Sequence, residues 1–351
     1  MTLGTEDCQA QLAAARQRAD EPYVACVTTQ AADTSAVPDQ AALWAARQVW
    51  RTPAWCDDHG VANAWYIDRT RGCGIFRAKL TVRDARTGRE IGGITYLITG
   101  YHFTARDART WAYQVQLMEV SRWGTGVSGT TVSGSASCTG KCKVRSSDFP
   151  RQAITANKEP FGQFFMDTTI NTAARNQKGT GTSVASWRFA NPAWATPSNS
   201  TRLATTDVRC DNALPGTTRQ VGCVNPGYIP VVSYSTTGPW PELAKHIRYA
   251  QDTRRLPGKF GTSRYLTRLT DTAKIKKNRK KACPSSRPRP AGKSCDEYPF
   301  ASTWQGARTG DGKYSWRMIN ETQNTEGGRA LNGFYTYSRI LEKDKFLVWI
   351  R

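Results

Sequence analysis

Ten cysteines, spread in close pairs along a chain of 351 residues, constrain the fold more than any other feature of the sequence. Structural zinc needs clusters of Cys and His, but the chain has only three histidines and its cysteines form no two-plus-two clusters beside them. We therefore predict disulfides between neighbours along the chain: Cys8 with Cys26, Cys56 with Cys73, Cys138 with Cys142, Cys210 with Cys223, and Cys283 with Cys295. A set of this size indicates an oxidising compartment and hence a secreted protein.

Positive charge is concentrated toward the C-terminus. The formal net charge is +21, and residues 236–351 alone carry +14 of it. Such a field attracts polyanions, of which nucleic acid is the commonest, although an anionic membrane surface or a cell-wall polymer would also fit. No stretch approaches the roughly 18 uninterrupted apolar residues of a membrane-spanning helix, so we predict no membrane span.

The hydrophobic pattern changes along the chain. Residues 6–18 and 39–50 are rich in Ala, Leu, Gln and Arg and predict two short helices. Between residues 62 and 187, apolar and polar side chains alternate in short runs separated by polar turns, which predicts antiparallel strands in a sandwich-like or barrel-like sheet. The stretch 191–237 is rich in Pro, Ser, Thr, Gly and Asn and indicates a disulfide-stapled connection between domains.

Helical periodicity returns after residue 239. We expect one helix that opens at Pro241, a second that Asp271 caps and a third over residues 328–341, with strands at 314–319 and 346–350. The predicted fold class is therefore multidomain, in three parts: a helical N-terminal segment at residues 1–60, an antiparallel β-rich, sandwich-like domain at residues 61–235, and a small α+β domain at residues 236–351.

Two adjacent carboxylates lie inside the basic C-terminal third. Asp296 and Glu297 directly follow a run of cations from Lys274 to Lys293. Such surroundings keep a carboxylate pair ionised, so that it can hold a divalent cation or orient a water. The alternative is that both residues only offset the charge of neighbouring lysines on a loop.

Short motifs accompany the acidic pair. They are CDEYPFAST at residues 295–303, QNTEGG at residues 323–328 and GFY at residues 333–335, ahead of a terminal apolar strand. A helix-borne histidine, His246, and the basic segment 273–283 come before them. In this order the motifs resemble the NucA/NucB family of secreted bacterial deoxyribonucleases, over about residues 239–351.

The resemblance implies metal-assisted hydrolysis of DNA phosphodiesters with little sequence preference, in a small α+β nuclease domain. Asp296 and Glu297 match the acidic pair of the family motif, and His246 matches its helix-borne histidine. Asn324 matches the Asn of a later polar turn. In the implied mechanism His246 is the base near neutral pH and Asp296 holds Mg²⁺ or Mn²⁺, while Glu297 is a second ligand or handles protons.

These assignments have structural alternatives. His246 shares an apolar stripe on its helix, as a buried core histidine would, and Asn324 can simply begin a turn. Two positions depart from the family pattern, since residues 258–262 lack the second histidine of many members and Glu326 replaces a common Gln. The candidate phosphate contacts, for which the alternative is a solvated charged face, are Arg268, Lys276, Lys277, Arg279 and Lys280.

Two functions of different class follow from the sequence. The first is a secreted, metal-dependent deoxyribonuclease. It is either a scavenger of extracellular DNA or a toxin whose β-rich domain attaches it to a delivery machine, a cell surface or a partner such as an inhibitor or immunity protein. The second is a non-enzymatic DNA- or cell-wall-binding protein with a disabled nuclease fold. The acidic pair favours the enzyme, because a pure polyanion binder has no need of carboxylates that repel phosphate.

Overall fold

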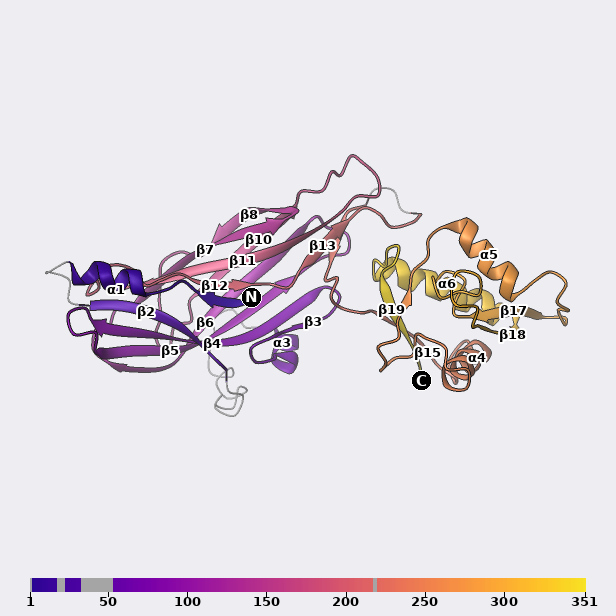
Figure 1. Ribbon diagram of the computed structural model, residues 1–351, viewed down its shortest axis with the longest axis horizontal. Coiled ribbons are helices and arrows are strands. Elements are labelled where there is room, and N and C mark those ends of the chain that lie inside the picture. Colours follow the sequence, from indigo (N-terminus) through magenta and orange to yellow (C-terminus); the bar gives the residue numbers. More distant parts are fainter. Residues whose placement is uncertain (1, 18–22, 33–52, 217–219) are drawn as a thin grey trace. The chain divides into compact units, whose positions relative to one another are not determined.

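The computed structural model describes residues 2–17, 23–32, 53–216 and 220–351 (Figure 1). The chain forms two compact units, each made of two stretches of sequence. The N-terminal unit contains Met1–Asp211 and Val221–Gly227, and the C-terminal unit contains Asn212–Gln220 and Tyr228–Arg351. Within the described ranges, no helix is both long and apolar enough to cross a membrane.

The N-terminal unit is built from two antiparallel sheets that share one core (Figure 1). The first has the order β2-β4-β5-β6-β10-β8 with β3 on β4, and its strands are Tyr23–Gln30 (β2), Trp65–Ile67 (β3), Arg71–Asp84 (β4), Glu90–Phe103 (β5), Thr110–Gly124 (β6), Cys142–Asp148 (β8) and Phe161–Thr168 (β10). The second has the order β1-β12-β11-β13-β14 with β7 on β11 and β9 on β7, and its strands are Leu3–Thr5 (β1), Thr131–Gly140 (β7), Gln152–Ala153 (β9), Lys178–Ala190 (β11), Thr201–Ala204 (β12), Val208–Asp211 (β13) and Gly222–Val224 (β14). Buried aromatic side chains from both sheets, such as Trp111 and Trp187, fill the core, so the predicted antiparallel β-rich region is confirmed.

The start of the chain is less helical than the sequence predicts. The first predicted helix is present as α1 (Gln9–Arg16), and a further short helix is α3 (Ala54–His59). However, β1 and β2 belong to the two sheets, so the prediction of a helical segment over residues 1–60 is wrong for the described part. Strand β2 escapes a period-two search because residues 24–27 are all buried, one after another. The second predicted helix, at residues 39–50, lies outside the described residues.

The stretch 191–237 holds the crossings of the chain between the two units, but it is built into both units and is not the separate connection that the sequence predicts. It contains β12, β13 and β14 of the second sheet, followed by β15 (Val231–Tyr234) of the C-terminal unit. These strands are three or four residues long and alternate with turns, so turn residues dominate the composition. The predicted staple, Cys210–Cys223, joins β13 and β14 at residues that are register partners.

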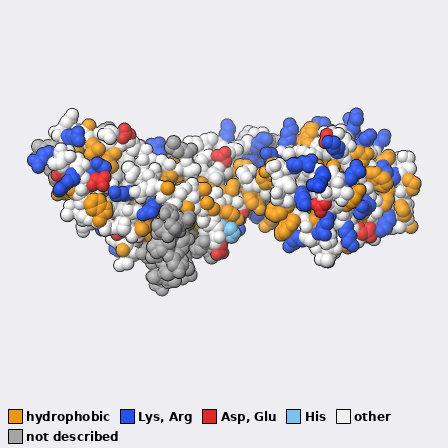
Figure 2. All heavy atoms as spheres, turned by 60° about the horizontal axis from the view of Figure 1, so that its bottom comes forward, with side chains coloured by type: hydrophobic (Ala, Val, Ile, Leu, Met, Phe, Trp, Pro, Cys, Tyr) orange, Lys and Arg blue, Asp and Glu red, His pale blue; other side chains and the backbone are white. Residues whose placement is uncertain are grey.

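The C-terminal unit is α+β, as predicted. Its mixed sheet has the order β15-β19-β16, with β15 parallel to β19 (Lys345–Ile350) and β16 (Leu266–Thr267) antiparallel to it. The remaining elements are the antiparallel pair β17 (Lys293–Tyr298) and β18 (Ser315–Asn320) and the helices α4 (Pro241–Asp252), α5 (Thr272–Ala282) and α6 (Glu321–Tyr337). Figure 2 shows Lys and Arg side chains spread over the visible face of this unit, at the right of the view, with few Asp or Glu among them.

All ten cysteines form disulfides, and the five predicted pairings are confirmed. Four of the disulfides lie in the N-terminal unit. The fifth, Cys283–Cys295, ties the end of α5 to the middle of β17, directly before Asp296. Five disulfides indicate an oxidising, extracellular-type environment.

Two helix starts in the C-terminal unit show where local signals suffice and where they fail. Asp271 caps α5 as predicted, since its side chain accepts hydrogen bonds from the backbone N–H groups of Ala273 and Lys274. Helix α6, in contrast, begins before the predicted residue 328, so the predicted polar turn at residues 323–328 is part of the helix. The pattern places the start too late because Gly327 and Gly328 are poor helix formers.

Gly327 and Gly328 offer a matched pair of substitutions that tests the packing of α6 on α4. A Cβ at Gly327 would overlap the buried side chain of Leu243, whereas a Cβ at Gly328 would meet no atom within 4 Å. We expect Gly327→Ala to lower the free energy of unfolding by about 1–3 kcal/mol through overpacking, although Ala is the better helix former. Gly328→Ala should raise it by up to about 1 kcal/mol. Urea denaturation followed by near-UV circular dichroism measures both, and equal effects at the two positions would contradict the close helix contact.

Candidate active site

His246 is fully buried between α4 and the β17-β18 pair. Its Nδ1 lies 2.6 Å from Oδ2 of Asp296 on β17, and its Nε2 lies 2.9 Å from the hydroxyl of Ser315 on β18. A neutral ring that donates through Nδ1 to the carboxylate can accept from the hydroxyl through Nε2. Both ring nitrogens are therefore engaged, and no part of the ring reaches solvent. This geometry fits the structural alternative better than a base that takes a proton from water.

Asp296 has one carboxylate oxygen engaged and one available. Oδ2 is held by His246, whereas Oδ1 makes no hydrogen bond to any residue in the described part of the chain. The side chain is 8% exposed and lines a cavity of about 870 Å³. The buried histidine therefore fixes the direction in which Asp296 presents its second oxygen.

Glu297 lies in a different electrostatic environment from the one that the sequence predicts. Burial and the neighbouring charge of Asp296 together raise the pKa of Glu297 to about 8, against the opposite influence of Arg279 and of a hydrogen bond from the Ala301 backbone. The prediction that surrounding cations keep both carboxylates ionised is thus wrong for Glu297, because burial outweighs the cations. At neutral pH this side chain carries a proton in the absence of a bound cation.

The pKa of Glu297 predicts a pH-dependent gain in stability for Glu297→Gln. The folded state holds this proton up to about pH 8, whereas the unfolded chain releases it near the ordinary value of 4.5, so the native state loses stability as the pH rises between those values. Glutamine does not titrate. The difference in free energy of unfolding between the variant and wild type should therefore be larger at pH 9 than at pH 4, by on the order of 2 kcal/mol in favour of the variant. Urea denaturation in EDTA measures it. An identical difference at the two pH values would contradict the raised pKa.

Asn324 faces the same cavity from α6. Its Nδ2 donates to the Ser294 hydroxyl at 2.9 Å and to the Cys295 carbonyl at 3.2 Å. These bonds fix the amide plane and leave Oδ1 as an acceptor without a partner among the described residues. The alternative role as a turn initiator is wrong, since Asn324 lies within the first turns of a helix.

The guanidinium of Arg268 is buried, and it makes no hydrogen bond to a residue in the described part of the chain. Arg268 is 8% exposed, and its guanidinium carbon lies 3.6 Å from the ring centroid of Tyr335. Nε and Nη1 are buried and make no hydrogen bond to any described residue, and burial lowers the pKa of this guanidinium. Such a group is costly unless it meets an anion, and Arg268 lines the cavity that Asp296 lines.

Five of the nine predicted site residues line this cavity, and four do not. It is lined by Asp296, Glu297, Asn324, Arg268 and Arg279. His246 lies behind Asp296, and three lysines of α5 are exposed outside the cavity: Lys276, Lys277 and Lys280. Sequence reasoning missed Arg289, Arg329 and Ser302 in the lining and Ser315 behind it. Their only sequence signal is the general excess of positive charge, because nothing local marks a cavity wall.

Comparison with protein families identifies this part of the chain. Residues 257–349 match the family described as Deoxyribonuclease NucA/NucB. The C-terminal unit contains a NucA/NucB deoxyribonuclease domain. The predicted resemblance and the predicted enzyme class are thereby confirmed. Curated proteins gave no match to the chain.

The first and last residues of the NucA/NucB match show which elements of the C-terminal unit it includes. It includes β16, α5, β17, β18 and α6 and ends inside β19, so the whole cavity lining lies within it. Helix α4, which carries His246, lies before its first residue, although the sequence resemblance extends to residue 239. The N-terminal unit lies entirely outside the match.

The donor groups in the cavity of the NucA/NucB domain restrict which metal ion could bind. Among the described residues, no group of three or more His, Cys, Asp or Glu side chains is arranged to hold a metal. The available donors are the carboxylates of Asp296 and Glu297 and the amide oxygen of Asn324. Magnesium is commonly bound through one or two carboxylates and keeps several waters, so this oxygen-only set fits Mg²⁺ or Mn²⁺ and not a zinc site.

Proposed function

We propose that the C-terminal unit is a metal-dependent endonuclease that hydrolyses DNA phosphodiesters with little sequence preference. One observation carries the proposal. A single cavity, inside the residues that match the deoxyribonuclease family, is lined by two carboxylates, an amide oxygen and an arginine whose Nε and Nη1 make no hydrogen bond to a described residue. Hydrolysis of a phosphodiester needs a cation-binding carboxylate, a proton carrier and positive charge near the phosphate oxygens, and the residues that line the cavity have side chains of these three kinds.

In the proposed mechanism Asp296 and Asn324 hold a divalent cation, Mg²⁺ or Mn²⁺, and Glu297, which lines the same cavity, is either a second ligand or the group that handles the proton. The bound ion would polarise the phosphate and the attacking water. His246 is assigned a positioning role, since it holds Oδ2 of Asp296 and keeps Oδ1 directed to the cavity. This assignment replaces the role of general base.

Glu297 is proposed to handle the proton of the reaction. As long as Glu297 is not a ligand of the ion, its pKa of about 8 leaves the carboxyl group protonated at neutral pH. In that state it can give a proton to the leaving oxygen as the P–O bond breaks, and the resulting carboxylate can be reprotonated from water. A carboxyl group with an ordinary pKa would be ionised and unable to donate.

Arg268 and Arg279 are proposed to bind the scissile phosphate. The lysines of α5 are proposed to bind the phosphates on either side of it. Arg268 and Arg279 line the cavity, and the buried N–H groups of Arg268 lack a partner that a phosphate oxygen would provide. The exposed side chains of Lys276, Lys277 and Lys280 can contact flanking phosphates. Phosphate contacts carry no base information, which supports low sequence preference.

The N-terminal unit is proposed to attach the nuclease to a surface or partner. We propose a secreted protein, because five disulfides are stable only in oxidising surroundings. We further propose that residues 236–351 act as the nuclease domain of a toxin, with residues 61–235 as its β-rich delivery or binding domain. The separate core of the N-terminal unit supports a role apart from catalysis.

The test is digestion of supercoiled plasmid by the full chain with Mg²⁺, with Mn²⁺ and with EDTA, beside a single-stranded RNA of similar length. We expect nicked and then linear and fragmented plasmid with either metal and intact plasmid in EDTA. A retarded but intact plasmid under all conditions would overturn the nuclease proposal and favour a DNA-binding protein with a disabled site. Faster loss of the RNA than of the plasmid would overturn the assignment of DNA as substrate.

A further inference from the structure

Two exposed aromatic side chains lie against each other, with tilted ring planes, on the C-terminal unit, outside the lining of the cavity that holds Asp296. Phe260 is 45% exposed and Trp349, on β19, is 44% exposed, and their ring centroids lie 5.2 Å apart. The backbone N–H of Phe260 donates to the carbonyl of Val348 at 3.0 Å, so the loop that carries Phe260 is fixed to β19. This backbone contact keeps the two residues side by side, and the two rings are here called the Phe260–Trp349 surface.

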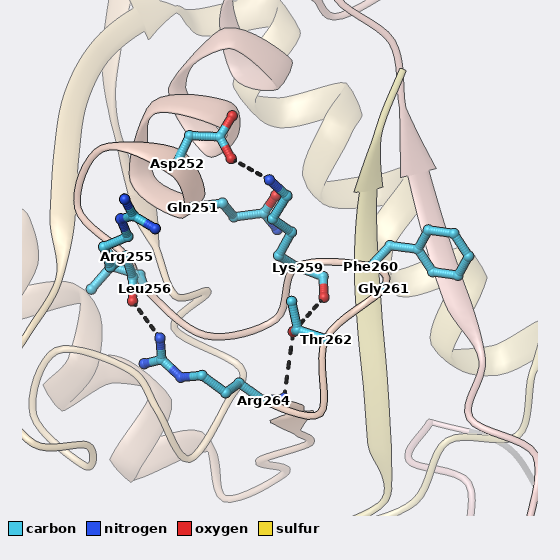
Figure 3. A pocket seen from close by; sticks show the side chains of 9 residues that line it. All are labelled: Gln251, Asp252, Arg255, Leu256, Lys259, Phe260, Gly261, Thr262 and Arg264. Carbon is cyan, nitrogen blue, oxygen red and sulfur yellow. Dashed lines mark hydrogen bonds and ion pairs between the residues drawn. The ribbon is translucent and has the colours of Figure 1, made fainter.

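The Phe260–Trp349 surface is surrounded by cations. The guanidinium of Arg351 lies 5.5 Å from the Trp349 ring centroid, and Arg248 donates to the carbonyl of Arg351 at 3.1 Å. Two adjoining cavities, of about 560 and 160 Å³, share Lys259 and Phe260 in their lining. In Figure 3 the Phe260 ring points away from its loop toward the yellow strand, and the guanidinium groups of Arg255 and Arg264 lie on the other side of the loop.

Negative charge is almost absent from this surface. Asp252 is the one carboxylate among the described residues that line the two cavities, and it forms an ion pair with Lys259 at 2.7 Å. The remaining charged side chains of the lining are arginines: Arg248, Arg255 and Arg264. The net charge therefore complements a polyanion.

We propose that the Phe260–Trp349 surface binds a single-stranded segment of nucleic acid, with unpaired bases stacked on the rings and phosphates on the arginines. Aromatic platforms inside a positive groove bind single strands without sequence preference, because every base has a face to stack. A duplex hides those faces, so its bases cannot reach the rings. The proposal depends on the proposed nuclease function in one respect only, namely that the bound polyanion is a nucleic acid.

A hydrogen bond connects the lining beside the Phe260–Trp349 surface with β17, the strand that carries Asp296. Gln251, in the lining, donates to the Tyr298 hydroxyl at 3.0 Å, and Tyr298 follows Asp296 by two residues on β17. The lining of the two cavities shares no residue with the lining of the cavity at Asp296. A frayed or already cut strand bound here would stay on the enzyme while another phosphodiester occupies the active site.

Binding without turnover tests the inference. The probe is fluorescein-labelled (dT)20, titrated by anisotropy with the full chain carrying Asp296→Asn in EDTA, beside a 20-base-pair duplex. We expect Phe260→Leu/Trp349→Leu to weaken (dT)20 binding at least about tenfold and duplex binding less than about threefold. Leucine keeps apolar bulk but cannot stack, so the fold should persist. The matched control is Trp123→Leu, since Trp123 is 42% exposed in the N-terminal unit and also lies near a lysine, Lys79.

Three results would overturn the inference. They are unchanged (dT)20 affinity in the double variant, an equal loss with Trp123→Leu, and loss of binding to phosphatidylserine-containing vesicles with (dT)20 binding retained. The last would make this a membrane-contact surface. The inference and the proposed function fail separately. A wild-type chain that leaves plasmid intact removes the nuclease, whereas selective loss of (dT)20 binding would still support the surface.

Discussion

An Asp296→Asn chain is expected to cleave plasmid DNA at least about 1,000-fold more slowly than wild type at the same Mg²⁺ concentration. Asparagine keeps the shape of the side chain and can still hydrogen-bond to His246, so the β17 strand should stay in place. It removes the negative charge that would hold the cation. Loss of a cation that stabilises the transition state costs several kcal/mol, which corresponds to a factor of this size.

Asp311→Asn is the matched control for that substitution. Asp311 is a carboxylate of the same unit, its side chain is 65% exposed, and it forms a surface ion pair with Lys313. We expect its plasmid cleavage rate to stay within about twofold of wild type. If Asp296→Asn also kept the wild-type rate, with an unchanged melting temperature, the cavity would not be the active site.

The second large effect is expected at His246, and two substitutions separate positioning from base catalysis. His246→Ala removes both hydrogen bonds of the ring and leaves a void, so cleavage should fall about 100-fold or more and the melting temperature should drop. His246→Asn retains a side-chain donor that can reach Asp296. We expect His246→Asn to cleave plasmid about tenfold faster than His246→Ala.

The pH dependence of cleavage decides between the two roles of His246. If the ring only positions Asp296, the residual activity of His246→Asn should follow the same pH profile as wild type. If His246 were the base, both variants would be equally slow and the profile would lose the limb that belongs to the histidine. Rates of plasmid nicking between pH 5 and 9, at saturating Mg²⁺, give this comparison.

Local features of this chain were predictable because neighbouring residues determine them. Asp271 caps α5 through backbone groups two and three residues away, and the longest disulfide loop spans a sequence separation of 18. The acidic pair stands inside a contiguous motif, so its place in the family could be recognised without the fold. In each case the partners lie within a short stretch of sequence.

Burial was not predictable, and it decides what the site residues can do. Ser315, the second partner of His246, is 69 residues away along the chain. The cations next to Glu297 in sequence mostly point to solvent, so proximity in sequence overstated their influence on its pKa. Arg268 looked like one basic residue among many, and only the fold shows that its buried Nε and Nη1 make no hydrogen bond to a described residue. Sequence alone therefore named five residues that line the cavity and misjudged the protonation of Glu297 and the accessibility of His246.

Because α4 and β15 lie outside the family match, the matched residues are a poor guide to where a fragment of the C-terminal unit can be cut. Strand β15 pairs in parallel with β19, and Leu243 and Ile247 of α4 belong to the core of the C-terminal unit. A fragment cut at residue 257 would expose that core and lose the imidazole behind Asp296. The smallest autonomous piece of this nuclease is therefore larger than its recognisable signature, and an expression boundary belongs before Val231.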